Sequence, residues 1–156
     1  MNKQVVERVS QEIEILKREI GGGGVGGERV KMGKVQIQAN QYLGVIIKNL
    51  GVNPAIFQGV KSLNALLLLP ESYPKTPPIG CYVDRPYTVQ NSHFVRTGYH
   101  GAPTLEAQGW RWFCHGVGGF SGQGQQGTWR PSPDPGDGHN LATVLAASRV
   151  AMNTKC

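Results

Sequence analysis

The sequence has few cysteines, and they lack the spacing of a disulfide framework. Three cysteines are spread over 156 residues, an odd number without a Cys-x-x-Cys pair. Small secreted domains that depend on disulfides carry even, closely spaced sets, so we expect a reducing, cytoplasmic location. The four histidines are also scattered, and no two potential zinc ligands stand at a ligand-pair spacing. We therefore expect no metal site on this chain.

Long hydrophobic runs are absent as well. The longest apolar stretch, around 66–69, falls far short of the roughly 20 residues that cross a bilayer. The first twenty residues mix acidic and basic side chains, unlike the apolar centre of a secretory signal. The sequence thus predicts a protein that is neither exported nor embedded in a membrane.

Charge is scarce and only weakly basic. Sixteen Lys and Arg against ten Asp and Glu give a net charge of +6, without a dense basic run. The aromatic cluster of Trp110, Trp112 and Phe113 around Arg111 could stack on bases, although packing in the core is the expected role. A small nucleic-acid-binding protein, with an affinity that falls steeply with salt, is therefore only the alternative from another functional class.

Glycine, in contrast, is abundant. Many of the 22 glycines gather in two runs, 21–27 and 116–127, which predict loops. The first run follows a helical pattern and lacks the Lys-Ser/Thr ending of a phosphate-binding loop, which argues against a nucleotide site.

The amino-terminal half predicts one helix and three strands. Apolar residues at helical spacing form a stripe that ends at Gly21; they are Val6, Val9, Ile13, Leu16 and Ile20. Apolar residues alternate over 30–39 with one slip near Gly33, which predicts a strand with a bulge. Two further apolar runs, 41–50 and 60–69, complete a three-stranded antiparallel meander.

The carboxy-terminal half predicts loops, short strands and a closing helix. Four prolines between residues 70 and 78 exclude a strand and favour an ordered irregular loop. Strand-like pieces at 80–84 and 109–113 stand among polar turns, and a helical pattern with Leu141, Val144, Leu145 and Ser148 on one face starts after a cap at Asp137 or Asn140. The whole is expected to be a single domain over residues 1–156, of mixed α/β (α+β) class.

This order of elements, together with two motifs, resembles the ubiquitin-conjugating enzyme family. Residues 73–78, Tyr-Pro-Lys-Thr-Pro-Pro, are similar to the family's YPxxPP motif after its third strand. Residues 129–131, Trp-Arg-Pro, are similar to the W-x-P that follows the active-site cysteine, and Tyr99-His100-Gly101 stands near the family's Tyr-His-Pro. The resemblance covers nearly the whole chain and implies an amino-terminal helix, a β-meander, a loop-rich active-site region and a carboxy-terminal helix.

The resemblance implies a nucleophile and its helpers. Cys114 is the only cysteine between Tyr99-His100 and Trp129, so it corresponds by position to the cysteine that carries a ubiquitin-like modifier as a thioester. Assistance is expected from His115, His100 or Asn91, and the active-site scaffold comprises Tyr73, Pro74, Pro77, Pro78, Trp129 and Pro131. Cys81 and Cys156 are the less favoured thiols.

The resemblance also implies partners. An activating enzyme would supply the ubiquitin-like modifier at the expense of ATP, and a target protein would receive it on an amine or a hydroxyl. This chemistry implies no cofactor on the chain itself. Four basic residues of the first helix, Lys3, Arg8, Lys17 and Arg18, are expected either on its solvated face or as a docking surface for the activating enzyme. Asp134 and Asp137 are expected in a turn and a cap, or else near an incoming lysine.

The sequence departs from the family at three points, the first of which is a longer segment between Pro78 and Tyr99. Ala102 and Pro103, rather than the family's asparagine, come after the His100-Gly101 pair, and the loop 116–127 is additional. This compact form is more similar to bacterial members, which occur in modifier-conjugation or antiviral gene sets. A catalytically inactive module that binds a modifier or an activating enzyme is therefore the alternative within the same fold.

Overall fold

The structure, a computed structural model, describes residues 3–19, 30–37, 39–55, 57, 59–84, 105, 107–113 and 129–152. Its elements are helix α1 (Lys3–Glu19), strands β1 (Val30–Ile37), β2 (Asn40–Gly51), β3 (Ser62–Leu69), β4 (Gly80–Val83) and β5 (Arg111–Phe113), and helix α4 (Leu141–Met152). The predicted catalytic residues Cys114, His115, His100 and Asn91 lie outside the described residues, as does the glycine-rich loop 116–127.

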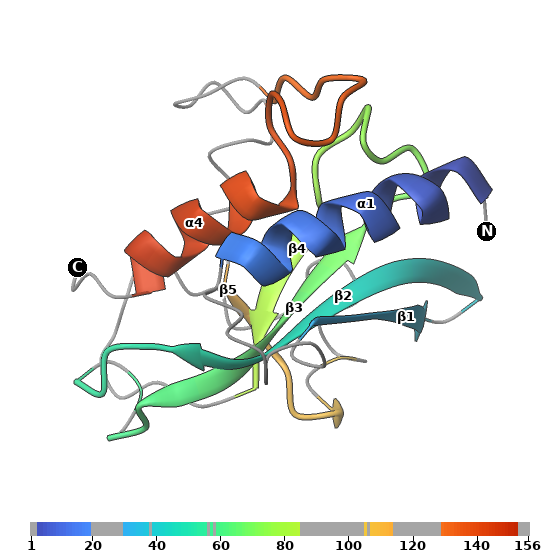
Figure 1. The fold of residues 1–156 in the computed structure, drawn as a ribbon. Helices are drawn as coiled ribbons and strands as arrows, with labels where there is room; N and C mark the ends of the chain where they lie inside the picture. The colour runs from blue at the N-terminus through green and yellow to red at the C-terminus, as the bar shows by residue number, and fades with distance from the viewer. Residues whose placement is uncertain are drawn as a thin grey trace.

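The strands form one antiparallel sheet in sequence order, β1-β2-β3-β4-β5. The predicted three-stranded meander is confirmed, and the short pieces near 80–84 and 109–113 extend it as β4 and β5. Helices α1 and α4 contact one another and cover the same face of the sheet (Figure 1). Segregated helices on one face of an antiparallel sheet make an α+β fold, as the sequence predicts at this level.

The core has two parts because both faces of the sheet are apolar. Between the helices and the sheet, a large buried cluster includes residues from α1, from the inner face of β2 and β3, and from α4. A smaller cluster lies on the opposite face, around the buried Leu66, Leu68 and Tyr82. The central strand β3 is buried on both faces, which explains its unbroken run of leucines.

The predicted bulge in β1 is wrong. β1 pairs with β2 in a continuous register from Val30 to Ile37. The slip in the apolar pattern arises because Val30 belongs to the helix-side cluster, whereas Val35 and Ile37 pack on the other face. The irregularity of the sheet lies instead between β2 and β3, where the register shifts between Ile47 and Leu50.

The buried stripe of α1 also differs slightly from the predicted one. Val9, Ile13 and Leu16 are buried as predicted, but Val5 is buried where Val6 is only half-buried. No helix within the described ranges is both long enough and apolar enough to span a bilayer.

Candidate functional site

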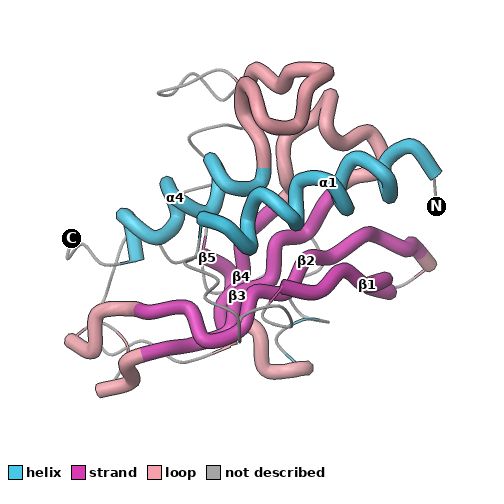
Figure 2. The backbone as a smooth tube through the Cα atoms, in the orientation of Figure 1, coloured by secondary structure: helices cyan, strands magenta, loops and turns pink. Residues whose placement is uncertain are grey.

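Two irregular segments meet beside helix α1, at one end of the sheet. The proline-rich loop 70–79 joins β3 to β4, and the segment 129–140 leads into α4 (Figure 2). These segments carry the two motifs of the sequence, YPKTPP and WRP. Neither segment is part of a β-ladder, so contacts made by side chains help to fix the path of its backbone.

Trp129 joins the two motifs directly. Its indole Nε1 donates a hydrogen bond of 2.7 Å to the backbone carbonyl of Pro74. Its ring also lies near that of Tyr73, with centroids 6.1 Å apart and an interplanar angle of 44°. Both aromatic side chains are buried, so they supply the apolar surface on which the two segments pack.

Glu12 of α1 is the polar centre of this junction. Its carboxylate is fully buried, and its Oε1 accepts hydrogen bonds from the Tyr73 hydroxyl and from the backbone N–H of Leu141. Its Oε2 accepts a hydrogen bond of 2.6 Å from Nε of Arg8. A buried carboxylate needs such partners, and here they come from α1, the proline-rich loop and the first turn of α4.

Arg8 extends the network to the WRP segment. Its Nη1 donates to the backbone carbonyls of Ser132 and Pro133. Its Nη2 is buried and has no hydrogen-bond partner among the described residues. Arg8 as a whole residue is 9% exposed, so it belongs to the buried network rather than to the solvated face that the sequence predicts for it.

The segment 129–140 is closed on itself by a small bridge. Pro131 and Gly138 form an antiparallel β-bridge, and Arg130 exchanges two hydrogen bonds with His139: its N–H with Nδ1 at 2.8 Å and its carbonyl with the His139 N–H at 2.9 Å. Gly138 has a φ of +64°, and a Cβ there would lie 2.8 Å from the Arg130 carbonyl. Only glycine fits this position without strain. The His139 ring packs against that of Trp129, with centroids 5.6 Å apart and planes tilted by 32°.

The segment ends in the cap of α4. The Asn140 side chain accepts a hydrogen bond of 3.0 Å from the Thr143 N–H, while Thr143 Oγ1 accepts one from the Asn140 N–H. This reciprocal cap confirms Asn140 rather than Asp137 as the start of the helix. Asp134 and Asp137 are exposed and belong to the turn before it, as one of their two predicted roles requires.

Burial sets the electrostatics of the junction. The pKa of Tyr73 is raised far above the ordinary range of a phenol, first by desolvation and then by the charge and hydrogen bond of Glu12. The hydroxyl of Tyr73 therefore stays protonated and serves as a donor to Glu12 at any physiological pH.

The structure brings three of the predicted scaffold residues together, Tyr73, Pro74 and Trp129. Of the six, Tyr73, Pro78 and Trp129 are buried, and Pro74, Pro77 and Pro131 are half-buried. Cys81 is fully buried in the helix-side core, so its thiol does not reach the surface. Lys3 and Arg18 are exposed on α1. Lys17 forms an ion pair with Glu14, with 3.4 Å between Nζ and Oε1.

Sequence reasoning missed Glu12, which connects more segments than any predicted residue of the site. A signal was present: Glu12 lies on the apolar stripe, three residues after Val9 and four before Leu16, and four after Arg8. An acid and a base at this spacing on a buried helix face indicate an internal ion pair. Within the described residues, no three His, Cys, Asp or Glu side chains gather as metal ligands.

The junction holds the two loops in place, and none of its three segments, 3–19, 70–79 and 129–140, contains a cysteine. Among the described residues, its buried side-chain polar atoms have hydrogen-bond partners except Nη2 of Arg8, and Trp129 joins its two motifs. Such an arrangement can support reactive groups on adjoining segments. Comparisons of the chain with protein-family models, with curated proteins and with solved structures found no match.

Proposed function

We propose that this protein is a ubiquitin-conjugating-type carrier, which receives a ubiquitin-like modifier as a thioester on Cys114 and passes it to a target. The observation that carries the proposal is the register of the last two strands. β5 pairs antiparallel with β4, with Arg111 opposite Val83 and Phe113 opposite Cys81. β5 therefore ends beside the start of β4, where the proline-rich loop enters the sheet, and Cys114 is the next residue in the sequence.

The junction of the two motifs supports this proposal. A hydrogen bond joins the YPKTPP loop to the WRP segment. It runs from Trp129 to Pro74, which are 55 residues apart in the sequence. In the sequence, the YPKTPP motif comes before β4, and the WRP motif comes after β5 and Cys114. A rigid frame matters because acyl transfer requires the thiol and the incoming group to meet in one geometry.

The proposed chemistry consists of two acyl transfers. The Cys114 thiolate attacks the carbonyl carbon of the modifier's thioester on an activating enzyme, and the C–S bond to that enzyme's cysteine breaks. The departing thiolate takes up the proton that Cys114 released. A target amine or hydroxyl then attacks the Cys114 thioester and loses its proton, and the Cys114 thiolate leaves. ATP is consumed earlier, by the activating enzyme.

The remaining residues of the proposal have distinct tasks. His115, His100 and Asn91 are the candidates for proton transfer and for stabilising the developing oxyanion. Lys3, Lys17 and Arg18 are the candidates for docking the activating enzyme on α1. Arg8 leaves this set, because its guanidinium is engaged with Glu12.

The test is charging in an extract of the cells that produce the protein. Purified wild type, Cys114→Ala and Cys156→Ala are incubated with extract and ATP, then separated on non-reducing gels and weighed intact. We expect a modifier-sized adduct that a thiol reagent removes, formed by wild type and Cys156→Ala and lost in Cys114→Ala. Cys156 is the matched control, because Cys81 fills the core and its replacement also perturbs packing.

Two outcomes would overturn the proposal. An adduct that persists in Cys114→Ala would place the reactive group elsewhere. No adduct in an extract that charges its own conjugating enzymes would favour a non-catalytic module that binds the modifier or the activating enzyme, an alternative that the missing His-Pro-Asn asparagine supports.

A further inference from the structure

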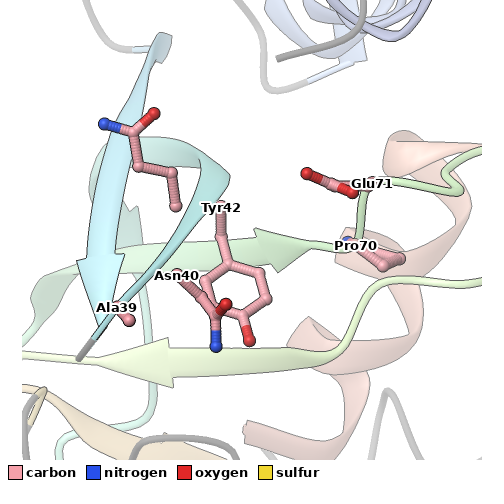
Figure 3. Close-up of a pocket in the computed structure, with 6 residues that line it drawn as sticks. Ala39, Asn40, Tyr42, Pro70 and Glu71 are labelled. Carbon is pink, nitrogen blue, oxygen red and sulfur yellow. The ribbon is translucent and has the colours of Figure 1, made fainter.

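A hollow opens on the sheet where β3 ends before β2 does. Leu43 of β2 pairs with Leu69 of β3, so one more step of the same register would set Tyr42 opposite Pro70. Pro70 instead turns the chain away into the proline-rich loop, while β2 continues to pair with β1 as far as Asn40. The space left beside β2 is a pocket of about 460 Å³, lined by Ala39, Asn40, Gln41, Tyr42, Pro70 and Glu71 (Figure 3).

The polar side chains of this pocket face solvent: Asn40, Gln41 and Glu71 are exposed, and Tyr42 is half-buried. In the part of the chain that the structure describes, the side chains of Asn40, Gln41, Tyr42 and Glu71 make no hydrogen bond or ion pair. Glu71 is the only charged residue among the six that line it. The formal charge of the lining residues is therefore −1, on a protein of net charge +6.

The walls of the pocket are held by the fold. Tyr42 packs against the buried cluster on the outer face of the sheet. Glu71 lies inside a turn that the Tyr73 N–H closes on the Pro70 carbonyl at 3.1 Å. In Figure 3 the Tyr42 ring lies between Asn40 and the pair formed by Pro70 and Glu71. An aromatic ring, a carboxylate and the Asn40 amide therefore border one opening.

We propose that this pocket binds the guanidinium group of an arginine side chain on a partner polypeptide. A guanidinium is planar, so it can stack on the Tyr42 ring while its N–H groups form a forked pair with the Glu71 carboxylate. The amide oxygen of Asn40, on the same face of β2 as Tyr42, can accept from one of its remaining donors. An ammonium group lacks the plane and the fork, and the carboxylate repels an anion.

The edge of β2 favours a polypeptide as the source of the guanidinium. Asn40–Tyr42 has β1 on one side, and on the other side no strand pairs with these residues in the described ranges. An extended segment can pair with such an edge while its arginine fills the pocket. This inference stands independently of the proposed thioester chemistry.

The probe is N-acetyl-arginine methylamide, titrated into the ¹⁵N-labelled full chain and followed by amide chemical shifts. We expect saturable shifts at residues 39–42 and 71, and none of them with the citrulline derivative, which has the same shape without the charge. Glu71→Gln is expected to weaken binding about tenfold, because a charge-assisted fork becomes a neutral contact. Tyr42→Leu should weaken it about threefold through loss of the cation–π contact.

Glu7→Gln provides the matched control, since Glu7 is exposed on α1 and its loss changes the net charge equally. Its affinity should equal that of wild type. Equal affinity for the arginine and citrulline derivatives, or equal weakening by Glu7→Gln and Glu71→Gln, would overturn the proposal. Agmatine, a guanidinium compound without a peptide backbone, is titrated in the same way. Amide chemical-shift changes with agmatine but not with the arginine derivative would contradict a polypeptide as the source of the guanidinium.

Discussion

The carboxylate of Glu12 and the hydroxyl of Tyr73, 61 residues apart in sequence, share a buried hydrogen bond that fastens the proline-rich loop to α1. The same carboxylate oxygen accepts the first N–H of α4, from Leu141. One side chain therefore sets the relative positions of α1, the YPKTPP motif and the helix that follows the WRP segment.

Replacing Glu12 should destabilise the fold strongly. Glu12→Gln leaves the Arg8 guanidinium buried without its counter-charge, and breaking a buried pair from one side costs about 3–5 kcal/mol. Urea unfolding followed by circular dichroism measures the loss. Glu14→Gln is the control, since Glu14 is exposed and its ion pair with Lys17 should contribute about 0.5 kcal/mol or less. Similar losses in the two variants would show that the buried network does not support the fold.

A substitution at Trp129 can remove one hydrogen bond of the junction while an aromatic ring is kept in place. Trp129→Phe keeps an aromatic ring but removes the donor to the Pro74 carbonyl, at a cost of about 1 kcal/mol in stability. The proposed charging of Cys114 should slow at least about tenfold, because the two motifs are no longer fastened together.

The comparison variant for this prediction is Trp110→Phe, since Trp110 packs on the opposite face of the sheet. Charging time courses of both variants, measured at a temperature where each is folded, provide the comparison. Equal slowing in the two would contradict a specific role of the Trp129 hydrogen bond.

Two glycines that face each other in the sheet should respond differently to the same change. Gly33 of β1 pairs with Gly44 of β2. A Cβ at Gly44 would lie 2.7 Å from Cγ2 of Val35 and 2.9 Å from Cδ1 of Leu66, whereas one at Gly33 meets nothing within 4 Å. Gly44→Ala should therefore cost about 1–3 kcal/mol from overpacking, and Gly33→Ala should be neutral or slightly stabilising. Thermal unfolding of the two variants checks this, and equal melting temperatures would contradict the close packing at Gly44.

Alkaline pH should destabilise the protein through its buried tyrosines. Burial is the first cause that raises the pKa of both Tyr73 and Tyr82 above the ordinary value of a phenol. Above about pH 10 the unfolded chain releases these protons while the folded chain keeps them, so stability falls by about 1.4 kcal/mol per pH unit for each tyrosine. Below that pH their full contribution is present.

Urea unfolding at pH 9 and pH 11 measures this effect. The loss between the two pH values should be smaller in Tyr73→Phe and Tyr82→Phe than in wild type, and smallest in the double variant. All other titrating groups are shared, so an unchanged loss in the double variant would show that these tyrosines ionise in the folded protein.

Periodicity in the sequence predicts most of the regular structure but not the contacts that join it. The meander and the carboxy-terminal helix follow from apolar spacing, since each element has to bury one face or both. The slip in the apolar pattern of β1 does not mark a bulge. The apolar residues of this strand change from one face of the sheet to the other, because apolar clusters cover both faces.

The polar centre of the site could not be predicted in the same way. A helical pattern places Arg8 and Glu12 one turn apart, but only tertiary packing shows that loop carbonyls and Tyr73 surround them. The resemblance indicated Tyr73 and Trp129 as scaffold residues, and the structure places both in the buried junction. The pocket at Tyr42 depends on where β3 leaves the sheet, which the run of leucines does not reveal.

The most direct test of the proposed carrier is the intact mass of Cys114→Ser after charging with ATP in the same extract. A serine at this position would capture the modifier as an oxygen ester, so the account predicts a mass gain of one modifier that survives thiol reagents, whereas the wild-type adduct is removed by them. A wild-type adduct that resists thiol reagents, or one that forms equally in Cys114→Ala, would contradict the account.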